Sequence, residues 1–140
     1  MYSSILVPVD LEEPSSWLKA VPTALELARC FKAPLTLGTV VEDRVAALEA
    51  QWSAVGFREL LSTASARLAQ LADELRGTSS METKVGTGSI GGGILDLAEQ
   101  IGADLIVLAS HRPGMRDWLI GANADRVVRH AGCSVLVVRQ

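Results

Sequence analysis

Two segments, one near each end of the chain, carry the residues best suited to hold a ligand. Asp10 stands at the end of an apolar run, and residues 109–123 form a polar stretch before a helical pattern. Within that stretch, Arg112 offers a planar, bidentate donor for phosphate oxygens. Gly121 lets the backbone come close to a ligand, and a helix that starts there presents free N–H groups and a partial positive charge. The second segment therefore predicts a phosphate site.

Dedicated catalysis finds little support in these residues. The sequence shows no Ser-His-Asp order and no paired carboxylates beyond chance, and His111 and His130 have no Cys or His at metal-ligand spacing. His111 either contacts phosphate or is a solvated loop residue. Cys30 and Cys133 belong to no CxxC pair, so we expect two reduced core thiols rather than a disulfide.

The charge balance argues against nucleic acid as a partner. The 140 residues carry a formal net charge of −3, whereas binding to a phosphate backbone needs a basic surface. Residues 111–140 nevertheless hold five arginines against two aspartates, which favours an anion near the last third of the chain. The sequence shows no secretion signal and no apolar run of about 18 to 20 residues. We therefore expect a cytoplasmic protein with neither nucleic acid nor membrane as a partner.

Five short runs predict β-strands at residues 4–9, 35–41, 81–87, 104–109 and 134–138. The first, fourth and fifth runs are continuously apolar, as in strands covered on both faces, whereas the third alternates like an edge strand. Between the runs, apolar residues recur at helical spacing. The sets are Val21, Ala24, Ala28, Phe31; Leu61, Ala64, Leu68, Leu71, Leu75; Ile94, Leu97, Ala98, Ile101; and Ala124, Val127, Val128, Ala131. Pro22 predicts that the first helix starts close to it or kinks there.

Strands that alternate with helices predict an α/β fold with an open, doubly wound, five-stranded parallel sheet, a Rossmann-like or flavodoxin-like three-layer sandwich. The length suits one domain over residues 1–140. In such folds small ligands bind in the crevice outside the carboxyl ends of the strands. Asp10 and the segment from Ala109 onward are expected at that place.

Three features leave alternatives open. Residues 42–60 either extend the second helix or form a lid. The SIGGG cluster at residues 89–93 favours a flexible strand-to-helix turn over a phosphate cradle, because no GxGxxG or Walker spacing is present. Asp10 either binds a ligand or is an ordinary turn residue or helix cap.

Three motifs together resemble the universal stress protein family over essentially the whole chain. They are ILVPVD at the start, GSIGGGIL before the third helix, and SHRPG followed by GANADRVVRHAGCSVLVVR at the end. The chain resembles most the small nucleotide-binding members with an SHRP loop. The resemblance implies strand order 3-2-1-4-5, a homodimer formed through the last strand (Ser134 to Val138), and bound ATP, or ADP or AMP in its place, with or without Mg²⁺.

The resemblance also implies the nucleotide-binding residues. The aspartate that contacts ribose falls on Asp10, after Pro8 and Val9, and the residue whose backbone reads adenine falls on Val40. The phosphate region falls on two short runs, Ala109, Ser110, His111, Arg112 and Gly121, Ala122, Asn123. Slow ATP hydrolysis or self-phosphorylation, known in the family, would involve Ser110 and His111.

Two departures from the family pattern weaken the nucleotide prediction. The first two glycines of the motif G-x2-G-x9-G-[ST] fall on Leu108 and His111, and the final Ser/Thr falls on Ala122. One hydrogen bond to a charged acceptor is worth about 1.5 to 3 kcal/mol, which is roughly one to two decades in affinity. The sequence thus predicts a nucleotide-binding stress-response dimer without dedicated catalysis. The alternatives are a dimeric scaffold that has lost nucleotide binding and, by fold analogy alone, a flavin-binding redox module.

Overall fold

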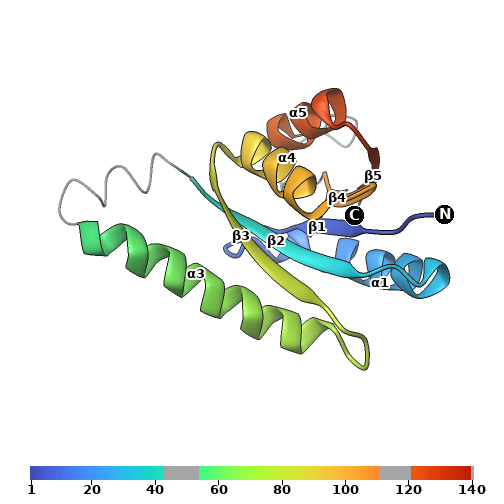
Figure 1. Ribbon diagram of the computed structural model, residues 1–140, viewed down its shortest axis with the longest axis horizontal. Helices are drawn as coiled ribbons and strands as arrows, with labels where there is room; N and C mark the ends of the chain where they lie inside the picture. Colours follow the sequence, from blue (N-terminus) through green and yellow to red (C-terminus); the bar gives the residue numbers. More distant parts are fainter. Residues whose placement is uncertain (43–53, 111–120, 140) are drawn as a thin grey trace.

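The computed structural model describes residues 1–42, 54–110 and 121–139, and these form a five-stranded parallel sheet of order β3-β2-β1-β4-β5. The strands are β1 (Ile5–Pro8), β2 (Leu35–Glu42), β3 (Glu82–Gly88), β4 (Leu105–Ala109) and β5 (Ser134–Val138). The helices are α1 (Ala20–Phe31), α3 (Ala54–Leu75), α4 (Ile90–Ile101) and α5 (Ala122–His130), with a 3-10 turn η1 (Pro14–Ser16). Figure 1 shows the arrangement. The predicted fold and strand order are confirmed.

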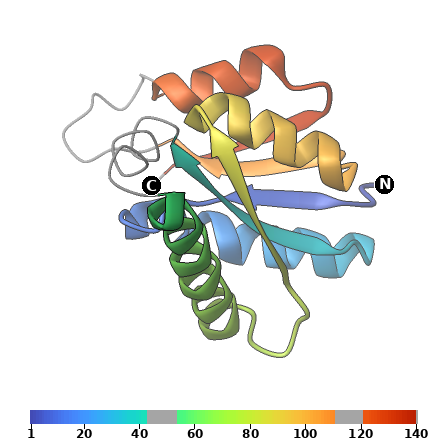
Figure 2. The ribbon, with the colours of Figure 1, turned by 60° about the vertical axis from the view of Figure 1, so that its left-hand side comes forward.

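The helices cover the two faces of the sheet in pairs, α1 and α3 on one face and α4 and α5 on the other (Figure 2). Alternation along the central strands supplies both cores. Ile5 and Val7 of β1 face α1 and α3, whereas Leu6 between them faces α4 and α5. This two-sided burial explains why β1 and β4 are continuously apolar in sequence. The alternating third run forms β3, an edge strand, as predicted. The prediction that the fifth run is covered on both faces is wrong, because β5 is the other edge strand and only Val138 of its five residues is buried.

The element boundaries differ from the predicted ones mainly at β1 and at the second long helix. β1 ends at Pro8 rather than at residue 9. α3 begins at Ala54, so part of the segment 42–60 does extend that helix, and residues 43–53 lie outside the described residues. Pro22 is the third residue of α1, where the missing N–H would have no partner within the helix. The predicted start near the proline is therefore confirmed, and none of the described helices is both long and apolar enough to cross a bilayer.

The glycine cluster before α4 allows two close helix contacts. A Cβ at Gly93 would lie 2.5 Å from Val40 Cγ1, and a Cβ at Gly91 would lie 2.7 Å from Arg126 Cδ. Ser89 caps the helix by accepting a hydrogen bond from the Gly92 N–H. Residues 90–93 therefore form the first turn of α4, so the prediction of a flexible strand-to-helix turn is wrong for them. Their glycines let α4 approach β2 and α5.

The two cysteines differ in their surroundings. Both are free thiols, but Cys30 is exposed on α1, so the prediction of a core thiol is wrong there. Apolar neighbours in sequence suggested burial, whereas the buried face of α1 is set by Ala20, Val21 and Ala24. Burial, aided by the charge of Asp104, raises the pKa of the half-buried Cys133 thiol.

Asp104 fastens the start of β1 to the start of β4. Its carboxylate accepts hydrogen bonds from the Ser3 N–H (2.9 Å), the Ser4 N–H (3.0 Å) and the Ser3 hydroxyl (2.9 Å). The backbone N–H groups of Ser4 and Ser3 therefore hold the pKa of this carboxyl below its usual value. Because β1 is central, this contact aligns the strand that leads to Asp10.

We predict that Asp104→Asn lowers the midpoint of urea unfolding at pH 7, because one oxygen that accepts N–H donors becomes an amide donor. The folded-state pKa is lowered, so the carboxylate contributes its full stability above the unfolded Asp pKa of about 3.9 and loses it as pH falls through the folded value. The difference between wild type and variant should therefore shrink below about pH 4. Asp73→Asn, at an exposed pair with Arg76, is the control and should change the midpoint little. Equal differences at pH 7 and pH 3 would contradict the assignment.

Candidate functional site

A cavity of about 440 Å³ opens at the carboxyl ends of the parallel strands. Nine of the eleven predicted binding residues line it: Pro8, Val9, Asp10, Val40, Ala109, Ser110, Gly121, Ala122 and Asn123. The other two, His111 and Arg112, lie outside the described residues. The structure thus gathers residues that are more than one hundred positions apart in sequence around one space.

The cavity exists because β1 stops while its neighbours continue. β1 pairs with β2 only as far as Pro8 opposite Gly38, although β2 runs on to Glu42. On the other side, the register with β4 ends at Leu6 opposite Ile106, although β4 runs on to Ala109. The crossovers on the two sides of β1 also lead to opposite faces, which is the switch point where ligands bind in doubly wound sheets.

Pro8 explains the early end of the ladder with β4. Ser4 accepts hydrogen bonds from the N–H groups of Asp104 and Leu105, so even-numbered residues of β1 turn their peptide groups toward β4. Pro8 is the third residue of that series, after Ser4 and Leu6, and it has no N–H to donate. The missing donor agrees with the end of the β1–β4 register at Leu6, and both Pro8 and Leu108 beyond that point line the cavity.

Val40 turns its main-chain polar groups toward the cavity. The carbonyl of Gly38 accepts from the Val9 N–H (2.8 Å), so Val40, two residues later on β2, has its N–H and C=O on the same side. The oxygen of Val9 that Val40 would otherwise meet accepts instead from the buried Thr39 hydroxyl (2.9 Å). Among the described residues the Val40 peptide groups have no backbone partner on this side. An adjacent donor and acceptor therefore face the open space.

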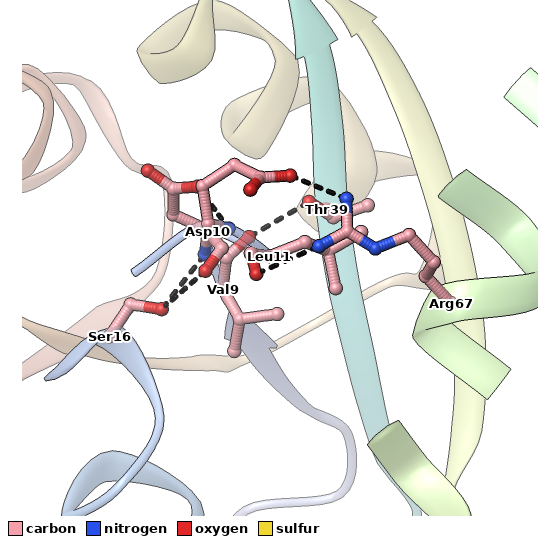
Figure 3. Close-up of polar contacts among 7 residues, drawn as sticks. Val9, Asp10, Leu11, Ser16, Thr39 and Arg67 are labelled. Atoms are coloured by element: carbon pink, nitrogen blue, oxygen red, sulfur yellow. Dashed lines mark hydrogen bonds and ion pairs between the residues drawn. The ribbon is translucent and has the colours of Figure 1, made fainter. Parts of the chain in front are cut away.

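Asp10 lies in a tight, hydrogen-bonded turn at the rim of the cavity (Figure 3). Its N–H donates to the Ser16 hydroxyl oxygen (2.9 Å), and its Oδ1 accepts from the Glu12 N–H (2.9 Å). The turn interpretation of Asp10 is therefore correct in geometry. It does not exclude binding, because only one carboxylate oxygen has a partner among the described residues.

The first turn of α5 closes the opposite side of the cavity. Gly121 is the N-cap and provides no side-chain hydrogen bond, so the first N–H groups of the helix lack a cap from that residue. Ala122 brings no hydroxyl, as the sequence indicates, whereas Ser110 and Asn123 both line the cavity with polar side chains. Together with the helix dipole, these groups suit a negatively charged ligand atom.

The charges along the cavity are unequally placed. Asp10, Glu13 and Glu42 stand at the β1 and β2 end, and no Lys or Arg of the described residues lines the space. An anionic group is therefore disfavoured at that end and favoured at the start of α5. The cavity has a polarity that would orient an elongated ligand with one charged end.

A family model described as the universal stress protein family matches residues 1–139. Universal stress protein G of Shigella flexneri is 34% identical over 142 residues, which cover 99% of this chain and 100% of that protein. The chain belongs to the universal stress protein family.

Three solved structures of universal stress proteins share the fold. One, in complex with cAMP, has a TM-score of 0.64 and 23% identity and covers 99% of this chain and 97% of that one. The protein of Archaeoglobus fulgidus in complex with dAMP has a TM-score of 0.59 and 19% identity, with 97% of each chain covered. The Arabidopsis thaliana protein with AMP bound has a TM-score of 0.62 and 17% identity, with 99% and 92% covered.

Eight further residues that line the cavity of this universal stress protein were not predicted from the sequence. They are Glu13, Ser16, Thr39, Val41, Glu42, Ile90, Ile94 and Ala124. The position of Thr39 at the cavity could have been inferred from its place next to Val40 on the predicted strand. The positions of Glu13 and Glu42 depend on how loops and strand ends align in space. Leu108, where the resemblance implies a glycine, is buried and belongs to the core under α4 and α5. It forms part of the wall and does not fill the cavity.

Gly121 is a glycine that the described fold does not require. Its φ is −58°, which any residue adopts, and a Cβ there would meet only the Ser110 oxygen, at 4.0 Å, among the described residues. Gly93 is the opposite case, since its Cβ would also lie 3.1 Å from the Thr87 oxygen. A ligand that approaches the backbone at Gly121 would explain the glycine there.

We predict that Gly93→Ala lowers the free energy of unfolding by about 1 to 3 kcal/mol through overpacking, whereas Gly121→Ala changes it by less than about 1 kcal/mol. Urea unfolding of the two variants, followed by circular dichroism, tests this contrast. A larger loss at Gly121 than at Gly93 would show that the fold, rather than a ligand, demands glycine at residue 121.

Proposed function

We propose that this universal stress protein binds an adenine nucleotide in the cavity at the carboxyl ends of its strands, without dedicated catalysis. The observation that carries the proposal is the meeting, around one space, of the unpaired Val40 peptide edge, the Asp10 carboxylate and the first turn of α5. The volume of about 440 Å³ falls within the range of roughly 300 to 1,000 Å³ usual for small-molecule sites. The complexes of its relatives with cAMP, dAMP and AMP support the same class of ligand.

The polarity of the cavity orders the three parts of the nucleotide. The adenine edge, which offers an amino donor beside a ring acceptor, pairs with the C=O and N–H of Val40. The ribose hydroxyls donate to the free oxygen of Asp10. The phosphate lies at the start of α5, near Gly121 and Asn123 and away from the carboxylates of Glu13 and Glu42.

The number of phosphates that the site can hold depends on positions where this chain departs from the family pattern. Ala122 supplies no hydroxyl, so Ser110 and Asn123 are the described side chains that can donate in its place. ATP, ADP and AMP all fit the proposal. Among the described residues no group of three or more His, Cys, Asp or Glu is arranged for a metal ion. Any Mg²⁺ would therefore be held mainly by the phosphates of the nucleotide.

The setting of the binding is also a proposal. We infer a cytoplasmic stress-response protein in which the bound nucleotide sets dimer shape or the choice of partner. Nucleic acid does not enter the proposal, because the net charge of −3 disfavours it.

A thermal-shift series with ATP, ADP, AMP and FMN tests the ligand class. We expect adenine nucleotides to raise the melting temperature, since a ligand at 100 times its Kd adds about 2.7 kcal/mol to stability. Asp10→Ala should lower the affinity for adenine nucleotides at least about tenfold, because one hydrogen bond to a charged group is lost. The rise in melting temperature should shrink accordingly. Gly121→Val should also weaken it by placing methyl groups where the phosphate lies, and Asp73→Ala, remote on α3, should respond like wild type.

The same series separates the alternatives. No stabilisation by any adenine nucleotide at millimolar concentration would leave a dimeric scaffold that has lost nucleotide binding. Stabilisation by FMN alone would favour the redox module. A response to ATP that is identical in wild type, Asp10→Ala and Gly121→Val would place the ligand elsewhere.

The partner we propose is a second copy of the chain, paired along β5. β5 is an edge of the sheet within one chain, and it is apolar, with Leu136 37% exposed. An apolar edge strand with free N–H and C=O groups invites pairing with another strand. The final strand of a second copy would satisfy those groups and cover Leu136.

We predict that Leu136→Glu converts the wild-type dimer to a monomer at micromolar concentration, because the new carboxylates would be buried at the interface. Sedimentation velocity measures this outcome. Leu18→Glu is the matched control, since Leu18 is more exposed (62%) and lies far from β5 in sequence, in the segment before α1. A wild-type monomer would refute the dimer, and loss of the dimer in both variants would refute the β5 interface.

A further inference from the structure

A second cavity, of about 420 Å³, lies beside the first on the α3 side of the β1 and β2 ends. The two cavities share Asp10, Thr39, Val40 and Val41. The new wall comes from α3, where Glu59, Thr63 and Arg67 recur every four residues and so lie on one face of the helix. Asp10 thus lines both cavities, whereas Leu11 and Glu12, which follow it, line only the second, together with α3.

Arg67 reaches across from α3 and holds the loop at two points (Figure 3). Its Nη2 donates to the Leu11 carbonyl (3.2 Å), and its Nη1 donates to the Glu12 carboxylate in an ion pair. The planar guanidinium makes both contacts at once, which a single ammonium group cannot reproduce at the same geometry. Arg67 therefore fixes both the main chain and the side chain of the residues that follow Asp10.

The contacts continue from Glu12 to Asp10. The Glu12 N–H donates to Asp10 Oδ1, so the position of the Glu12 peptide sets the orientation of the Asp10 carboxylate. From the other side, Ser16 accepts from the Asp10 N–H and donates to the Glu13 carbonyl (2.7 Å). The turn is therefore held by η1 on one side and by α3 on the other.

We propose that Arg67 is a positioning residue for the nucleotide site, acting through Glu12 on the Asp10 carboxylate. The inference rests on the proposed function, because it assigns Asp10 a ligand to meet. Arg67 itself lines only the second cavity and not the first. Its contribution is to reduce the number of orientations of Asp10 before the ribose arrives, which improves affinity by preorganisation.

The exposure of the ion pair decides what effect to expect. The side chains of Arg67 and Glu12 are 46% and 77% exposed, and exposed pairs contribute little to global stability. Arg67→Gln should therefore leave the melting temperature of the free protein almost unchanged. Its effect should appear in nucleotide affinity, as a loss of about two- to fivefold.

Calorimetric titration of wild type and five variants with AMP tests the proposal. Arg67→Gln should weaken AMP binding, and Arg67→Lys should recover part of the loss because it keeps one of the two contacts. Arg76→Gln is the matched control, since Arg76 is equally exposed (45%) and forms an exposed ion pair with Asp73 at the far end of α3. It should bind AMP like wild type. In an Asp10→Ala background, Arg67→Gln should have almost no further effect, because the two residues act through one chain of contacts.

Amide hydrogen exchange at Glu12, measured without ligand, provides an independent readout. The Glu12 N–H should exchange about two- to fivefold faster in Arg67→Gln than in wild type, and Arg76→Gln should not change it. If wild type binds AMP but Arg67→Gln changes neither affinity nor exchange, the positioning role is wrong and the proposed function stands. Equal losses of affinity in the wild-type and Asp10→Ala backgrounds would also overturn the role.

The opposite failure is distinguishable. If wild type binds no adenine nucleotide while Glu12 exchange still depends on Arg67, the proposed function is wrong. Arg67 would then hold the Asp10 turn for a purpose other than nucleotide binding, and the inference as stated would be refuted with the function.

Discussion

The missing N–H of Pro8 is the constraint on which the site depends. A central parallel strand normally donates to both neighbours, and a proline there removes one bond of the ladder. In this chain the lost bond faces β4, and the register between β1 and β4 ends at Leu6. β2 and β4 then extend past β1 on either side, so the sheet has a notch at its carboxyl edge. The cavity that Val40 and Gly121 line lies at this edge of the sheet.

Two clamps at opposite ends of β1 keep this notch in place. At the amino end, the Asp104 carboxylate gathers the N–H groups of Ser3 and Ser4 and sets the register against β4. At the carboxyl end, the Thr39 hydroxyl holds the Val9 carbonyl, and the turn after it is closed through Ser16 and Glu12. A strand of only four residues is thereby aligned by side chains as well as by its ladders. The position of Asp10 follows from both clamps.

The sequence was sufficient for those features that depend on one element or on the direction of parallel strands. Continuous apolar runs predicted the buried strands β1 and β4, although the equally apolar fifth run forms the edge strand β5. The carboxyl ends of β1 and β4 had to meet at one edge, so Asp10 and Ala109 were expected together. Features that depend on how separate elements align in space could not be predicted from the sequence. The exposure of Cys30 follows from the face that α1 presents, and the contact of Arg67 with Leu11 joins residues far apart on elements whose spacing no local pattern encodes. The approach of Arg126 to Gly91 is of the same kind.

The packing of Val40 against Gly93 limits how the cavity can change during evolution. The side chain of Val40 lies against the start of α4, where even one added carbon on the glycine would collide with it, while its peptide groups face the cavity. Replacing this side chain therefore alters the fit of a helix and leaves the atoms that a ligand would meet the same, because every residue but proline carries them. New ligand preferences at this wall would have to arise by shifting the whole strand or by altering its neighbours. The main chain of Val40 is thus the part of this wall that a point mutation changes least.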